Sequence, residues 1–158
     1  MRTLIIGYGN RSRADDAVGW FVVEQLERLR LPGVELLTSH QLEVDHAELV
    51  SQFDTVILVD AASPESPQQI ARAVVRPKYQ SHAVAHYLTP ADVLALSEMV
   101  FGRAPLGILF SIRGLDFNFG TTLSPETEQA ARDVVRQIHT LILKLERGAE
   151  TGGLTANA

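Results

Sequence analysis

The chain has 158 residues, of which 46% are hydrophobic and 21% charged, and its formal net charge is −5. This composition is that of a globular protein, long enough for one domain with its own core. The acidic balance, without a local block of lysine and arginine, argues against a nucleic-acid partner. The absence of cysteine excludes disulfides, thiolate metal sites and a cysteine nucleophile.

The first half of the chain predicts three strands and two helices. Residues 3–6 are a short apolar run typical of a strand covered on both faces. Apolar residues at helical spacing then predict a helix from Asp15 to the LPG at 31–33. Residues 34–37 predict a second strand and 45–51 a short helix. The strongest strand pattern is TVILVDAA at 55–62, because an apolar run without alternation is expected of a central parallel strand.

The second half continues the alternation. Residues 70–75 predict a strand at an edge of the sheet, since Pro77 follows at once. Thr-Pro and Ser-Pro pairs predict the starts of helices at 89–100 and 124–148, with a strand at 107–112 between them. This order predicts a three-layer α/β/α fold with a mostly parallel, twisted sheet in a single domain.

The two ends of the sequence and its apolar runs lead to predictions about location and disorder. The first strand pattern begins at Arg2, which leaves no room for a signal peptide, and no apolar run approaches the roughly 18 residues of a membrane span. We therefore expect a cytoplasmic protein without membrane contact, and nothing in the sequence demands more than a monomer. The folded domain is expected at 1–147, and the small, polar segment 148–158 is expected to be a disordered tail.

The loop GYGNRS after the first strand invites comparison with phosphate-binding turns. Ser12 stands where the dinucleotide fingerprint has its third glycine, and the Gly-Lys-Ser/Thr ending of the P-loop is absent. Gly7 and Gly9 are expected to supply positive φ in a tight turn that Asn10 tolerates. A nucleotide-binding module is one alternative function that this loop leaves open.

Two adjacent carboxylates, Asp15 and Asp16, open the first expected helix. Asp15 suits the N-cap, where a carboxylate meets free backbone N–H groups. Asp16 lies inside the first turn and points elsewhere, so a cation is a plausible partner. Asp60 ends the central strand, at the edge where open α/β sheets bind ligands, although it could instead cap a turn. Asp16 and Asp60 can converge at this edge.

Histidines offer a third type of ligand. His82 and His86 are four residues apart, which is half of a metal motif if the segment is helical, but the helix start at Thr89 favours a loop. His139 is most simply a surface residue of the last helix. Two carboxylates and one imidazole form a hard oxygen and nitrogen site that suits Ni, Zn, Mn or Fe. No G-x-S-x-G or H-E-x-x-H motif indicates a serine hydrolase or a standard zinc peptidase.

Several motifs together resemble the [NiFe]-hydrogenase maturation endopeptidases, from Thr3 to about Leu145. They are GYGN, DDAVG, VILVDAA, HYLTPADVLAL, FGRAPLGILFSIRG and GTTLSPETEQA, in this order. The resemblance implies a phosphorylase/hydrolase-like α/β/α fold and an aspartic-type endopeptidase that trims a hydrogenase large-subunit precursor. The enzyme would remove the C-terminal extension after nickel insertion. Nickel would come with the substrate as a recognition element, or also as a Lewis acid that polarises the scissile carbonyl or activates water. No organic cofactor is implied.

The resemblance also assigns residues. The metal-contacting residues fall on Asp16, Asp60 and His86, and His86 is preferred over His82 because it directly precedes YLTPADVLAL. Asp16 and Asp60 are also the candidate catalytic residues. Gly9 and Asn10 would shape the substrate site, with backbone N–H groups available to a developing oxyanion.

The segment TSHQLEVDHAEL after the second strand departs from the pattern of many relatives. We interpret it as a substrate-binding loop that contains His40, Gln41 and Asp45. Helix capping for Asp45 and simple exposure for His40 are equal alternatives. A non-catalytic carrier that binds the precursor and its metal without cutting is the main alternative function.

Overall fold

The structure, a computed structural model, describes residues 1–80 and 87–156, and side chains up to residue 150. Within these residues five strands form one sheet in the order β2-β1-β3-β5-β4. Neighbouring strands are parallel except for β4, which pairs antiparallel with β5 at the sheet edge. The strands are β1 (Thr3–Tyr8), β2 (Val34–Ser39), β3 (Thr55–Ala62), β4 (Ile70–Val75) and β5 (Leu106–Arg113).

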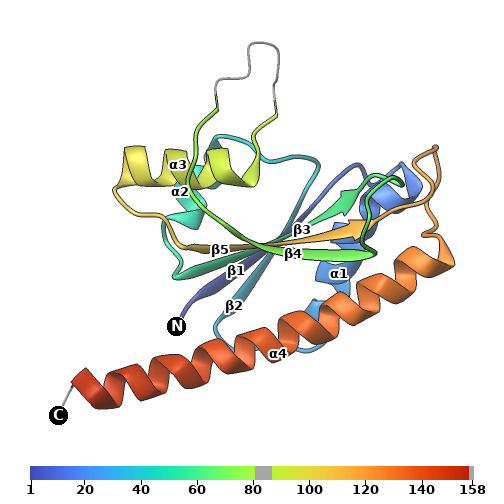
Figure 1. Cartoon of the computed structure of the whole chain (residues 1–158). Helices are drawn as coiled ribbons and strands as arrows, with labels where there is room; N and C mark the ends of the chain where they lie inside the picture. Colours follow the sequence, from blue (N-terminus) through green and yellow to red (C-terminus); the bar gives the residue numbers. More distant parts are fainter. Residues whose placement is uncertain (81–86, 157–158) are drawn as a thin grey trace.

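Helices cover both faces of the sheet, which confirms the predicted three-layer fold (Figure 1). α1 and α4 lie on one face, and α2 and α3 on the other. A 3₁₀ turn, η1, precedes α1. The helical elements are η1 (Ala14–Ala17), α1 (Val18–Glu27), α2 (Asp45–Val50), α3 (Pro90–Phe101) and α4 (Pro125–Ala156).

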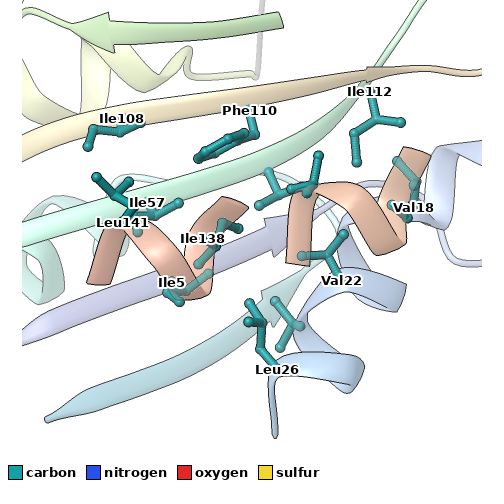
Figure 2. Close-up of a cluster of buried hydrophobic side chains, with 14 of the residues drawn as sticks. Ile5, Val18, Val22, Leu26, Ile57, Ile108, Phe110, Ile112, Ile138 and Leu141 are labelled. Carbon is teal, nitrogen blue, oxygen red and sulfur yellow. The ribbon is translucent and has the colours of Figure 1, made fainter. Parts of the chain in front are cut away.

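The central strands bury apolar side chains on both faces, as the unalternated pattern predicts. Ile5 and Ile57 join Phe110 in the cluster beneath α1 and α4, and Figure 2 shows this cluster with Ile138 of α4 among its members. The residues of opposite parity on β1 and β3 pack on the other face against α2 and α3. Burial on both faces makes β1 and β3 the rigid centre of the molecule.

The predicted start of α3 is confirmed in detail. The Thr89 hydroxyl accepts a hydrogen bond from the Asp92 backbone N–H (3.2 Å), and the Asp92 carboxylate accepts one from the Thr89 N–H (2.8 Å). This reciprocal capping box satisfies two helix N–H groups that would otherwise lack partners. Pro90 occupies the first turn, and Gly102 ends the helix with a φ of +74°.

The predicted end of the last helix near Gly148 is wrong. α4 continues to Ala156, because a glycine costs a helix only about 1 kcal/mol and no proline follows it. That residues 148–158 are disordered in solution stays a prediction. No helix in the described part of the chain combines the length and the apolar character needed to cross a bilayer.

Two glycines bring β1 and α1 into close contact. A Cβ on Gly7 would lie 2.1 Å from the carbonyl oxygen of Gly19, and a Cβ on Gly19 would lie 2.5 Å from that of Val59. Gly9 has the predicted positive φ, at +147°, but Gly7 does not. The prediction that Gly7 has a positive φ is therefore wrong. Glycine is required there because the backbone of β1 lies against the backbone of α1.

We expect Gly7→Ala to lower the free energy of unfolding by about 1–3 kcal/mol, because the added methyl group meets fixed backbone. Gly148→Ala is the matched control, since a Cβ there has no neighbour within 4 Å and replaces a helical glycine. It should be neutral or stabilising by up to about 1 kcal/mol. Urea denaturation of both variants measures these changes, and equal stabilities would contradict the close contact.

Candidate active site

The site lies where the order of the strands changes direction. From β1 the chain goes through α1 to β2 on one side, and from β2 it crosses to β3 on the other side of β1. Such a switch point leaves a crevice beyond the carboxyl ends of the two central strands. Asp60 lies near the end of β3, and Asp16 follows the end of β1.

A pocket of about 320 Å³ opens at this edge. It brings together five of the residues singled out from the sequence, namely Gly9, Asn10, Asp16, His40 and Gln41. The remaining residues that line it are Tyr8, Arg13, Leu42, Tyr87 and Leu88. The glycine turn after β1 and the segment after β2 therefore line the same pocket.

Asp16 is locked to the turn that precedes it. Its Oδ2 accepts a hydrogen bond from the Asn10 backbone N–H at 2.7 Å. A Cβ on Gly9 would lie 2.0 Å from the Asp16 carbonyl oxygen. The Gly9 N–H donates to the Ser39 carbonyl oxygen at 3.0 Å. The expectation that N–H groups of Gly9 and Asn10 await an oxyanion is therefore wrong, because both have acceptors already.

Asp60 has one satisfied and one unsatisfied oxygen. Oδ2 accepts a hydrogen bond from the Tyr8 hydroxyl at 2.9 Å. Oδ1 is buried and has no hydrogen-bond partner among the described residues. An unpaired buried carboxylate oxygen costs free energy unless a ligand or cation completes it.

The charge environment links the two carboxylates. Burial raises the pKa of Asp60; the hydroxyls of Tyr8 and Ser111 oppose this rise, and the negative charge of Asp16 adds to it. Burial also raises the pKa of Tyr8, helped by the adjacent Asp60 charge and the hydrogen bond to it. The charge of Asp16 reaches Asp60, but Asp60 is not in the pocket lining, so the convergence of the two aspartates on one site stays a prediction.

Asp15 has a structural environment, and its predicted role as the N-cap of α1 is wrong. Ala17 occupies that position without a side-chain cap. The Asp15 carboxylate is fully buried and accepts hydrogen bonds from the far end of the sequence. Its donors are the N–H groups of Leu115 (2.8 Å), Asp116 (3.0 Å) and Ser124 (2.7 Å) and the hydroxyls of Ser124 (2.8 Å) and Thr127 (3.0 Å).

These donors keep Asp15 ionised. Burial alone would raise its pKa, but the backbone N–H groups of Leu115, Ser124 and Asp116 and the Ser124 hydroxyl outweigh burial and hold the pKa below its ordinary value. A carboxylate with this many donors is strongly favoured in its charged form. Asp15 therefore fastens the loop before α4 to the turn that carries Asp16.

Other predicted site residues lie apart from the pocket or outside the described residues. Asp45 is exposed in the first turn of α2, is not in the pocket lining, and makes no capping hydrogen bond, since Val44 is the N-cap. His40 is exposed at the pocket rim. His82 and His86 lie outside the described residues. Within the described residues no three His, Cys, Asp or Glu side chains are grouped closely enough to hold a metal ion.

The pocket residues that the sequence reasoning missed include Tyr8 and Arg13. Tyr8 shares the parity of Leu4 and Ile6 on β1, so the period of two along a strand could have placed it on their face. Arg13 lines the pocket while its Nε donates to the Phe117 carbonyl oxygen at 2.9 Å. No local sequence pattern could predict this hydrogen bond, because the two residues are 104 positions apart.

We expect Asp15→Asn to lower the free energy of unfolding by about 3 kcal/mol or more, because an amide cannot accept from all of these donors. The folded-state pKa of Asp15 is lowered, so its contribution is complete above the unfolded pKa of about 4 and is lost as the pH falls further. Denaturation of both proteins between pH 7 and pH 3 measures this. A stability difference that stays constant across the range would contradict the charged state.

Comparison with known proteins relates the whole arrangement to one group of solved structures. No family model matches the chain, and no curated protein matches it. The [NiFe] hydrogenase maturation protease HycI from Thermococcus kodakarensis KOD1 is 24% identical, with a TM-score of 0.68 over 87% of this chain and 89% of that chain. The hydrogenase maturating endopeptidase HybD from E. coli is 21% identical, with a TM-score of 0.73 over 91% and 93%.

A third structure, the hydrogenase 2 maturation peptidase from Thaumarchaeota archaeon SCGC_AB-539-E09, is 21% identical with a TM-score of 0.67. The match covers 90% of this chain and 98% of that chain. At these identities the matches establish the architecture. The chain therefore has, over most of its length, the fold of the [NiFe]-hydrogenase maturation proteases.

Proposed function

We propose that the protein is an endopeptidase that removes the C-terminal extension of a [NiFe]-hydrogenase large-subunit precursor after nickel insertion. The observation that carries the proposal is Asp16 in the lining of the pocket at the switch point, together with Asp60, which is outside that lining and whose pKa the charge of Asp16 raises. The shared fold with solved maturation proteases supports it, as does the order of motifs from GYGN to GTTLSPETEQA.

Nickel in this proposal belongs to the substrate. Carboxylate oxygens are suitable donors for a divalent cation, and Oδ1 of Asp60 is a buried oxygen that lacks a partner among the described residues. His86 would supply an imidazole, on the strength of its motif. Two carboxylates and one imidazole leave positions for the precursor's own ligands, so nickel can serve as a recognition element between the two proteins.

The carboxylates also have the chemistry for peptide hydrolysis. Burial and the charge of Asp16 raise the pKa of Asp60, which makes it a better proton acceptor than an exposed aspartate. Asp60 would take the proton of the water that attacks the scissile carbonyl and would return it to the leaving amine as the C–N bond breaks. Asp16, held by the Asn10 N–H, would position the substrate-borne nickel. His40 and Gln41 at the rim would contact the precursor chain next to the cleavage site.

We expect Asp16→Asn and Asp60→Asn each to reduce cleavage by about 100-fold or more, the usual effect of losing a proton-transfer group or a positioning carboxylate. Folding should change little, because both side chains lie at the edge of the sheet and asparagine has the same shape. Asp133→Asn is the control, since it alters an exposed ion pair with Arg136 on α4. Mass spectrometry of the cognate nickel-loaded precursor measures cleavage, and full activity of both site variants would refute the proposal.

We expect cleavage of the nickel-loaded precursor and none of the nickel-free precursor under the same conditions. Nickel-independent cleavage would contradict its role as a recognition element. Binding of the loaded precursor without any loss of mass would favour the carrier. Saturable stabilisation by a dinucleotide in a thermal-shift experiment would favour the nucleotide-binding module.

A further inference from the structure

The contact between Tyr8 and Asp60 joins the two central strands at the site. Tyr8 is the last residue of β1, and its hydroxyl donates to Oδ2 of Asp60 on β3 at 2.9 Å. The ring of Tyr8 packs against the apolar cluster beneath α2 and α3, and the residue also lines the pocket. Packing therefore fixes the ring of Tyr8, and its hydroxyl, the one polar atom of the side chain, contacts the Asp60 carboxylate.

This hydrogen bond makes the two oxygens of Asp60 unequal. Oδ2 is held by Tyr8, whereas Oδ1 is buried and has no hydrogen-bond partner among the described residues. The terminal torsion of an aspartate is broad, so a carboxylate without a fixed donor can rotate and exchange its oxygens. The negative charge of Asp16 also acts on Asp60. The Tyr8 donor at Oδ2 opposes the rotation, and the hydroxyls of Tyr8 and Ser111 both favour the charged carboxylate against the repulsion.

We infer that Tyr8 is a positioning residue: its hydroxyl holds Oδ2 of Asp60 so that Oδ1 is the oxygen presented to the substrate and its nickel. The inference rests on the proposed function, because it assigns a partner to the carboxylate that the proposal places at the nickel. It gives a role to Tyr8 of the GYGN motif, for which the resemblance assigned none. Groups that orient a ligand in this way commonly contribute about 10–100-fold to metal affinity or activity.

Tyr8→Phe is the direct test, because it removes the hydroxyl and keeps the ring in the cluster. Tyr79→Phe is the matched control, since Tyr79 is 53% exposed and outside the pocket lining. We expect Tyr8→Phe to lower kcat/KM for the nickel-loaded precursor about 10–100-fold. Affinity for the nickel-free precursor should match that of the control, while the gain in affinity from nickel loading is reduced.

The double variant Tyr8→Phe/Asp60→Asn separates positioning from other roles. If Tyr8 acts through Asp60, adding Tyr8→Phe to Asp60→Asn has no further effect on nickel-dependent binding. Three results would overturn the inference about Tyr8. They are additive effects of the two substitutions in the double variant, a kcat/KM of Tyr8→Phe equal to that of the wild type, and a loss of affinity that is the same for nickel-free and nickel-loaded precursor. The proposed function would survive these results as long as Asp16→Asn and Asp60→Asn abolish cleavage. Unchanged cleavage by those two variants would instead overturn the proposed function itself.

Discussion

The buried carboxylate of Asp15 is the constraint on which the site depends. It gathers donors from the loop before α4 and from the first turn of that helix, between 100 and 112 residues further along the chain. Because Asp16 is the next residue, its backbone position is fixed by the same contacts. The loop after β1 has no strand or long helix of its own to hold it. A buried, fully hydrogen-bonded charge is a strong substitute, because a satisfied polar network in the interior makes the local structure rigid.

Asp15 and Asp60 are two carboxylates whose pKa values the protein environment shifts in opposite directions. Asp15 is surrounded by donors that hold its pKa below the ordinary value, so it gives the fold a permanent charge and has no oxygen left for a ligand. Asp60 is buried with fewer donors, and both burial and the charge of Asp16 raise its pKa. A buried carboxylate whose charged form is disfavoured is a candidate catalytic or ligand-binding group, because a bound cation or a proton lowers its free energy.

Features that depend on residues close together in the sequence could be predicted. Features that depend on contacts between residues far apart in the sequence could not. The cap at Thr89, the two-sided burial of β3 and the edge position of β4 follow from local composition, and all are confirmed. The partners of Asp15 lie a hundred residues away, so its local context indicated a cap that does not form. Gly7 needs a contact with α1 that no turn pattern reveals. The pocket residues found from sequence are those that directly follow strands, where topology alone brings loops together.

The hydrogen bonds of the glycine turn occupy the backbone N–H groups that an anionic ligand would need. Phosphate-binding turns offer free backbone N–H groups to an anion. In this chain the Asn10 N–H donates to the Asp16 carboxylate and the Gly9 N–H to Ser39, so the anion position is filled by the protein's own side chain. Asp60 adds a second carboxylate nearby, and two negative charges would repel a phosphate. The same strand–turn–helix geometry that holds nucleotides elsewhere therefore offers an anion no free N–H group of Gly9 or Asn10 here.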